Sequence, residues 1–296
     1  MYMKFRGHET FFIRKGWLYK GMSNVVKEPG VFQGAAGNPM DVLGIGANMV
    51  KALRYWLTTT CLTSEPKSGK RGQALTELGR VIFENDAYME EIGSIWLVHY
   101  MLAMNSDEAT SWYIFFNEFN KGEFTVEDFH SAVVKYVRMQ EDAAVPSDRA
   151  IEDDFTCIMN TYVSRIKLNP AKVHPESNID CPLGELGLVD VINKREGIYK
   201  KSVPKLDMIP KMILLSAIIN SAKGEKEIRI SSLQNDKCQI GKIFNLDSIT
   251  LINALYRLEG AGLIKVIRTA GLDIIRIETD MSFLECVEAY YDELNQ

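Results

Sequence analysis

The most regular pattern of apolar and polar positions lies between residues 38 and 60. Within 47–60, apolar side chains recur every three to four residues, which places them on one face of a helix. These side chains are Met49, Val50, Leu53, Trp56 and Leu57. Residues 39–43 are long enough for a short helix, and the glycines of the 44–46 segment supply the flexible backbone of a tight turn. The pattern predicts a helix-turn-helix.

The opposite face of helix 47–60 is predicted to carry amide, cationic and hydroxyl donors, which are the groups that contact phosphates and base edges. These donors are Asn48, Lys51, Arg54 and Tyr55. A basic segment at 63–73 follows and is predicted to form a β-hairpin, or wing, which winged-helix proteins lay against the DNA backbone. Its cations are Lys67, Lys70 and Arg71. The alternative is an amphipathic helix whose polar face contacts only water.

Two further helices complete the predicted N-terminal domain. One runs through 17–27, with Thr10 as a candidate cap upstream, and the other runs through 75–83, with Thr76 as its candidate cap. Residues 1–83 are therefore predicted to form a winged-helix-like DNA-binding domain.

The pattern from 84 to 166 is helical. Residues 92–102 are densely apolar and predict a buried helix, and hydroxyl caps at Thr125 and Ser147 open two further helices. Residues 167–204 contain four prolines and predict an irregular linker with one or two short elements, and hence a domain boundary.

Residues 205–296 repeat the winged-helix pattern. The segments 208–222, 230–235, 246–260 and 281–294 predict helices, and the runs 263–268 and 272–278 predict a β-hairpin. In the helix at 246–260, Asp247 is the expected N-cap, and the side chains expected to face inward are Ile249, Ile252, Leu255 and Leu258. The exposed side would offer Asn253, Tyr256 and Arg257, which favours an architectural or protein-binding role over reading DNA. The chain is thus predicted to be mainly α with minor β, and multi-domain.

Composition narrows the class of protein. The chain has 296 residues, of which 46% are hydrophobic and 25% charged, as is usual for globular domains. No apolar run reaches the length of a membrane span, and the N-terminus lacks a signal-peptide pattern. The five cysteines are scattered without a CxxC pair, which argues against a disulfide framework or zinc ribbon and favours the cytoplasm.

Charge is distributed unevenly along the chain. Residues 1–80 hold 12 Lys and Arg against 5 Asp and Glu, whereas residues 81–160 hold 4 against 16. A basic N-terminal third suits a polyanion, and an acidic middle would repel one. Nucleic acid is therefore expected at the N-terminal third, with the acidic middle as a candidate surface for partner proteins. The alternative is that the two regions neutralise each other within one fold.

The segment around His8 and Glu9 holds the candidate chemistry. A histidine beside a carboxylate can act as a general base or a metal-ligand pair, or it can form a structural hydrogen bond that anchors the N-terminus. The runs of acidic residues between 84 and 154 are most simply solvated helix faces, with a divalent-metal site as the alternative.

Five blocks of the sequence resemble a bacterial family long classed as of unknown function. The first two are FRGHETF followed by R.GWL.KG at 5–21, and LGIGANMVKALRYW at 43–56. The others lie at 75–100, 153–162 and 241–277, so the resemblance covers nearly the whole chain. The family includes SspB, described as a DNA-nicking protein of bacterial phosphorothioation systems that defend against phage.

The resemblance implies a function for this chain. It would bind double-stranded DNA and nick one strand so that sulfur can replace a phosphate oxygen, together with a cysteine desulfurase and ATP-using proteins. His8 would be the base or ligand, Glu9 would bind a divalent metal such as Mg²⁺ or Mn²⁺, and Arg14 would clamp a phosphate. No familiar nuclease signature is present. The alternative is therefore a non-catalytic winged-helix DNA-binding adaptor or transcriptional regulator.

Overall fold

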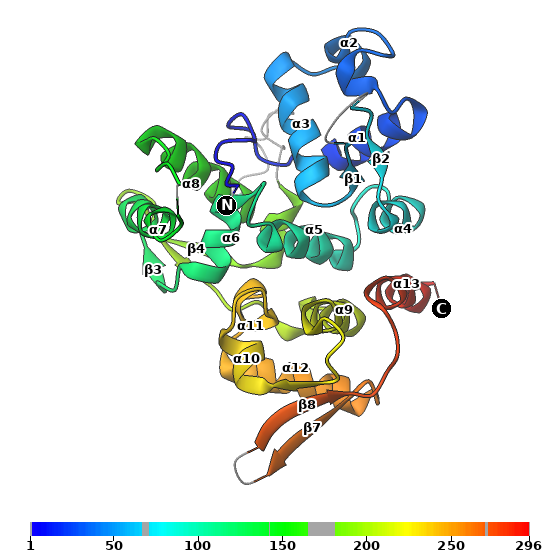
Figure 1. Cartoon of the computed structure of the whole chain (residues 1–296), viewed down its shortest axis with the longest axis vertical. Helices are drawn as coiled ribbons and strands as arrows, with labels where there is room; N and C mark the ends of the chain where they lie inside the picture. The colour runs from blue at the N-terminus through cyan, green and yellow to red at the C-terminus, as the bar shows by residue number, and fades with distance from the viewer. Residues whose placement is uncertain (1, 67–70, 142, 165–180, 270–271, 296) are drawn as a thin grey trace, which may run out of the picture.

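The computed structural model describes residues 2–66, 71–141, 143–164, 181–269 and 272–295. It consists mainly of helices, with three small antiparallel sheets of two, three and three strands (Figure 1). The prediction of a mainly α chain with minor β is therefore confirmed. No described helix combines the length and the apolar composition that a membrane span requires.

The N-terminal region follows the predicted order of elements. They are α1 (Trp17–Lys27), the 3-10 turn η1 (Val31–Gln33), α2 (Pro39–Leu43), α3 (Ala47–Thr59), β1 (Thr63–Ser64), β2 (Ala74–Leu75) and α4 (Glu77–Asn85). The Asn38 side chain accepts a hydrogen bond from the Met40 N–H at the start of α2, and Gly44, with a φ of 62°, ends it. Strands β1 and β2 pair antiparallel at the base of the predicted wing.

One predicted cap in this region is wrong. Thr10 does not begin a helix, because α1 starts seven residues later, after Gly16, whose φ of 79° is left-handed. Thr76 does cap α4, where its side chain accepts a hydrogen bond from the Gly79 N–H.

The middle region packs helices around an aromatic core. Its elements are α5 (Ile92–Met104), α6 (Thr110–Tyr113), the π-helical turn η2 (Ile114–Glu118), β3 (Glu123–Phe124), α7 (Val126–Arg138) and α8 (Asp148–Tyr162). Helix α5 is buried along most of its length, as predicted. Thr125 and Ser147 cap α7 and α8, because each begins a helix with a side-chain hydrogen bond to the first turn.

The described part of the predicted linker forms regular structure. It contains the 3-10 turn η5 (Pro182–Leu186), β4 (Val189–Asn193) and β5 (Ile198–Lys201). Strand β5 lies between β4 and β3, so this segment completes a three-stranded sheet with the middle region. The one or two short elements predicted in this segment are therefore present, and β5 adds a strand that was not predicted, because its partner β3 lies far away in sequence. The assignment of 167–204 as a linker stays a prediction.

The C-terminal region contains the predicted helices and hairpin. Its elements are η6 (Leu206–Met208), α9 (Lys211–Ala222), β6 (Glu227–Arg229), α10 (Ile230–Asn235), α11 (Ile240–Ile243), α12 (Ser248–Gly260), β7 (Ile264–Thr269), β8 (Leu272–Ile277) and α13 (Phe283–Leu294). Asp247 caps α12 as predicted. The inward position of Ile249 is wrong, because 74% of this residue is exposed and the helix instead buries Leu251, Ala254, Leu255 and Leu258.

Helix α13 returns from the C-terminal region to the other two, contacting α9 and α4 (Figure 1). The Gly93 N–H donates to the Tyr290 hydroxyl, and the hydroxyls of Ser94 and Tyr291 lie 2.6 Å apart. A Cβ at Gly93 would lie 2.3 Å from the Tyr290 ring, so only glycine permits this approach. The buried hydrophobic residues form a single cluster across all three regions. The domain boundaries predicted at 83, 166 and 204 stay predictions.

Candidate functional site

The N-terminal segment 5–16 forms a tight loop against α3. Arg6, Glu9 and Thr10 have φ values of 58°, 49° and 71°, a left-handed conformation that is uncommon for residues with a Cβ. The loop must therefore be held by its surroundings, because each such residue is strained in isolation. Trp56 of α3 supplies one contact by donating its indole N–H to the Phe11 carbonyl over 2.9 Å.

His8 is the centre of this loop and is fully buried. Its ring stacks on Trp56 at a centroid distance of 5.9 Å and meets the edge of Trp112 at 5.6 Å. The Thr10 N–H donates to His8 Nδ1 over 3.0 Å, so Nδ1 is unprotonated and Nε2 carries the hydrogen. Nε2 lies 2.7 Å from Asp154 Oδ1 and donates to it.

Asp154 of α8 gathers several donors around a buried carboxylate. Besides His8, the Arg6 N–H donates to Oδ1 over 2.8 Å and the Ser111 hydroxyl donates to Oδ2. The Arg6 side chain pairs with the neighbouring Asp153 at 2.8 Å. A buried carboxylate needs such donors, because its desolvation is costly. The network joins the N-terminal loop to α6 and α8.

This geometry decides between the two interpretations of His8 for the conformation described. The ring has no exposed surface, and its two nitrogens are occupied by Thr10 and Asp154. A general base must reach its substrate, directly or through one water. The arrangement therefore favours the structural hydrogen bond, with Asp154 rather than Glu9 as the partner.

Glu9 lies on the outside of the loop, next to the predicted DNA-reading helix. Its carboxylate is 3.7 Å from the Lys51 ammonium, and the side chains are 38% and 63% exposed. An exposed pair of this kind contributes little to stability and exchanges readily for another partner. The structure thus brings together one predicted catalytic residue and one predicted DNA contact.

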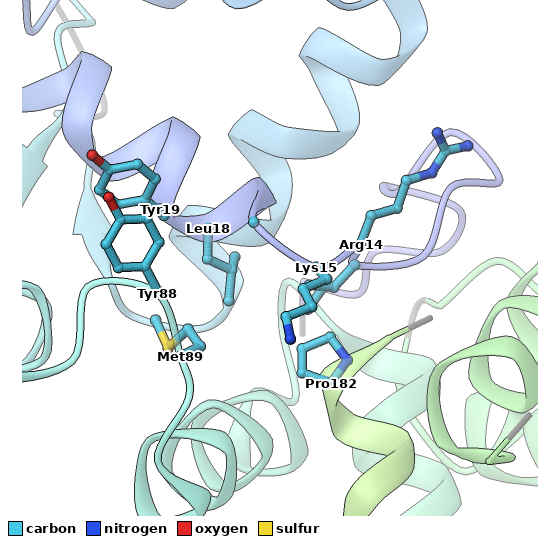
Figure 2. Close-up of a pocket in the computed structure, with 9 residues that line it drawn as sticks. Arg14, Lys15, Leu18, Tyr19, Tyr88, Met89 and Pro182 are labelled. Atoms are coloured by element: carbon cyan, nitrogen blue, oxygen red, sulfur yellow. The ribbon is translucent and has the colours of Figure 1, made fainter. Parts of the chain in front are cut away.

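Arg14 lies beside a small pocket between α1, the 88–89 loop and Pro182 (Figure 2). Its guanidinium points away from the tyrosine pair Tyr19 and Tyr88 and lies over the rings of Phe11 and Trp17, at 5.5 and 5.1 Å. Burial lowers the pKa of Arg14. Among the described residues, no carboxylate forms an ion pair with it. Arg14 is therefore a partly buried cation available to an anion, as a phosphate clamp requires.

The predicted polar face of α3 is only partly exposed. Asn48 and Lys51 face solvent. Arg54 is held by Glu65 through two hydrogen bonds to the carboxylate. The placement of Tyr55 on this face is wrong, because Tyr55 is 6% exposed and donates its hydroxyl to the Glu108 carbonyl over 2.9 Å. Helix α3 is covered on two sides, by α1 and by the N-terminal loop, so its exposed stripe is narrow.

Only part of the predicted wing, residues 63–66 and 71–73, lies within the described residues. Arg71 is exposed, and its carbonyl accepts a hydrogen bond from the Gln33 side chain. Lys67 and Lys70 lie outside the described residues.

Two members of the buried network around His8, Asp154 and Ser111, were not predicted from the sequence. Asp154 belongs to an acidic run that was expected on a solvated face, yet it is 1% exposed, and Ser111 carried no signal. The adjacent apolar positions Ile151, Phe155 and Ile158 mark the buried face of α8 and could have identified Asp154 as inward. Among the described residues, no three His, Cys, Asp or Glu side chains come together as a metal site.

The fold and the sequence are both similar to known proteins. Residues 5–291 match the family described as "Protein of unknown function (DUF4007)". A magnesium ion-bound SspB crystal structure matches with a TM-score of 0.82 and 24% identity, and covers 99% of this chain and 89% of that chain. A second SspB crystal structure matches with a TM-score of 0.84 and 25% identity over the same shares. No curated protein sequence matches. The chain therefore belongs to the DUF4007 family and shares the fold of SspB.

Proposed function

We propose that this protein is the DNA-binding component of a bacterial DNA phosphorothioation and phage-defence system, and that it nicks one strand of duplex DNA. The observation that carries the proposal is the likeness to SspB, which extends over 99% of the chain. The family match over residues 5–291 agrees with this likeness over the length of the chain, but the family is described only as one of unknown function. In this role the protein works in the cytoplasm with a cysteine desulfurase and ATP-using proteins.

The proposed DNA surface combines the exposed end of α3 with the loop beside it. Asn48 and Lys51 supply an amide and a cation, and Arg14 and Arg71 supply cations without an ion pair among the described residues. Lys67 and Lys70 would extend this surface along the wing. Such groups bind phosphate oxygens and release condensed counterions, so binding would weaken steeply with salt. The winged-helix assignment of the N-terminal and C-terminal regions is part of this proposal.

For strand cleavage, Glu9 and Arg14 are the accessible members of the predicted catalytic set. Arg14 would stabilise charge on a phosphate, and Glu9 would be the carboxylate nearest to the bound strand. Among the described residues, no group of three or more His, Cys, Asp or Glu side chains comes together as a site for Mg²⁺ or Mn²⁺. We therefore assign no step to a metal.

A second function is favoured by the buried state of His8. If the chain has no accessible base, it acts as a winged-helix DNA-binding adaptor that recruits other enzymes, or as a transcriptional regulator. The acidic surface of the middle region would then meet the partner proteins. The two functions share the DNA surface and differ only in whether a strand is cut.

Supercoiled plasmid tests the choice between the two functions. The purified protein is incubated with plasmid and Mg²⁺ or Mn²⁺, or with chelator, and open circles are counted on a gel. The nickase predicts open circles that Glu9→Gln abolishes while a mobility shift with the same plasmid persists. Intact plasmid with a normal shift, also after the partner proteins are added, would support the adaptor. Loss of both cutting and shifting in Glu9→Gln would instead assign this side chain to DNA binding.

A further inference from the structure

A cavity of about 290 Å³ opens between the middle and C-terminal regions, far in sequence from the proposed DNA surface. It is open to solvent, and its lining comes from the end of η2, from β5 and from the segment between α10 and the start of α12. The polar side chains that line it are mainly lysines and amides, namely Asn120, Lys121, Lys201, Gln234, Lys242 and Asn245. Asp247 also lines it, and its carboxylate is occupied as the N-cap of α12.

Lys201 places a cation at the inner wall of this cavity. Its ammonium donates to the carbonyls of Phe115 and Phe119, and it lies over the Phe115 ring at 4.7 Å and the Phe119 ring at 5.4 Å. An ammonium has three N–H donors, so these two acceptors leave one for the cavity. Within the described part of the chain, no carboxylate pairs with Lys201.

Lys242 places a second cation on the facing wall. Its ammonium donates to the Asn120 side-chain oxygen, a neutral acceptor, and no described carboxylate pairs with it. Burial and the positive charge of Lys242 together lower the pKa of Lys201 to about 7. If Lys201 served only to cap the π-helical turn, the second cation beside it would only destabilise the folded chain, because like charges repel. A bound anion would relieve that repulsion.

The amides complete a site suited to a tetrahedral oxyanion. Asn245 and Gln234 donate to the carbonyls of Ser202 and Leu246, which fixes both side chains at the cavity wall. The buried Oε1 of Gln234 has no hydrogen-bond partner among the described residues.

We propose that this cavity binds a phosphoryl group, and that the ammonium groups of Lys201 and Lys242 hold it. Asn120, which accepts a hydrogen bond from Lys242, also lines the site. The phosphoryl group belongs either to a free phosphate or nucleotide or to a strand of nucleic acid, because both present the same oxygens. The inference goes beyond the proposed nicking function and does not depend on it, since the cavity shares no residue with the α3 surface.

Calorimetric titration of the full chain with inorganic phosphate, pyrophosphate and ATP, at constant ionic strength, tests this inference. We expect binding by the unmodified chain, weakened about tenfold or more by Lys242→Met, since a charge-assisted hydrogen bond is lost. Methionine keeps the apolar stem, so we expect this variant to fold. The matched control is Lys237→Met. Lys237 is close to Lys242 in sequence but pairs with Glu118, and neither residue lines the cavity, so this variant should bind the phosphate ligands as the unmodified chain does.

The arms of the titration separate the two sources of phosphate. Binding of phosphate or ATP that a short oligonucleotide does not displace would indicate a small-molecule ligand. Binding of the oligonucleotide alone, reduced by Lys242→Met, would indicate a nucleic-acid strand. Absence of binding by all four ligands, or equal binding by Lys242→Met, would overturn the proposal. If Lys242→Met does not fold, a pH titration of the Lys201 ¹³Cε chemical shift in the unmodified chain tests the proposal instead. A bound phosphate stabilises the ammonium form, so adding phosphate must move this titration to higher pH, and no movement would overturn the proposal.

Discussion

The N-terminal and C-terminal regions repeat one order of elements, a helix pair followed by a hairpin, but they present opposite surfaces. On α3 the exposed polar side chains are Asn48 and Lys51, an amide and a cation. On α12 they are Ser248, Ile249, Asn253 and Tyr256, and this face includes no cation; Ile249 and Tyr256 are 74% and 47% exposed. The C-terminal hairpin neutralises its own arginines through Arg268–Asp273 and Arg276–Glu227 pairs. The same succession of elements can thus suit a polyanion at one end of a chain and a protein or structural contact at the other.

The two regions are also anchored differently, and each anchor centres on a buried histidine. In the N-terminal region His8 donates to the Asp154 carboxylate. The C-terminal region is held by His99 of the middle-region helix α5, which donates to the Ile243 carbonyl of α11 and accepts from the Tyr162 hydroxyl of α8, both over 2.8 Å. The first anchor depends on a buried charge and the second on neutral groups, so the two should fail under different conditions.

The largest expected effect comes from removing the buried charge. Asp154→Ala should lower the free energy of unfolding by about 3 kcal/mol or more, because His8, Ser111 and the Arg6 N–H lose a buried acceptor together. Denaturant unfolding measures the loss. The matched control is Asp153→Ala, which removes a partly exposed pair and should cost less than about 1 kcal/mol. Equal losses for the two variants would show that the network does not anchor the loop.

Acid should weaken the anchor around His99. Burial lowers the pKa of His99 from 6.5 to about 4. Between these pH values the unfolded chain binds a proton that the folded chain does not. The stability from His99 is therefore complete above about pH 6.5 and falls by about 3 kcal/mol as the pH drops to 4. Comparing unfolding at pH 7 and pH 4 should show a smaller difference for His99→Gln than for the unmodified chain.

The control for this pH effect is His130→Gln. His130 is more exposed and pairs with Asp148 at the surface, so the variant should keep the full pH dependence. The assignment to His99 would be wrong if His99→Gln lost as much stability on acidification as the unmodified chain.

A smaller effect separates the two helix faces. Lys51→Ala should weaken duplex DNA binding about tenfold and reduce the slope of log affinity against log salt by about 1, because one phosphate contact is lost. Lys265→Ala, on the exposed side of β7, should leave affinity and slope unchanged. Fluorescence anisotropy over a salt series measures both. If the two variants behave alike, the DNA surface is not on α3.

The smallest expected effect concerns α12. Ile249→Ala should change the free energy of unfolding by no more than about 0.5 kcal/mol, since the side chain is exposed. Leu255→Ala, on the buried face of the same helix, should lower the free energy of unfolding by about 2–5 kcal/mol. A large loss for Ile249→Ala would mean that this face is covered in solution, for example by a partner or a second copy.

Local signals predicted much of this fold. The bounds of α2 and α10 and the caps Thr76, Ser147 and Asp247 all depend on groups within a few residues of one another. What could not be predicted depends on distant partners. Tyr55 is buried because the N-terminal loop covers that side of α3, and β5 is ordered because β3, some 75 residues earlier, pairs with it.

The candidate site divides in the same way. The exposure of Glu9, Asn48 and Lys51 follows from residue type and helical period. The burial of His8 follows from three aromatic rings and a carboxylate that come from α3, α6 and α8. Adjacent letters in the sequence suggested a His8–Glu9 pair, but the left-handed turn at Glu9 directs the two side chains to different surroundings.

The return of α13 to α4 and α5 has a consequence for biosynthesis. The ribosome must complete more than 280 residues before Tyr290 and Tyr291 can cover Gly93 and Ser94. Until then the nascent chain carries an incompletely covered apolar helix. We expect it to engage chaperones late in translation, and a ribosome stalled before residue 283 to hold a chain that proteases digest readily.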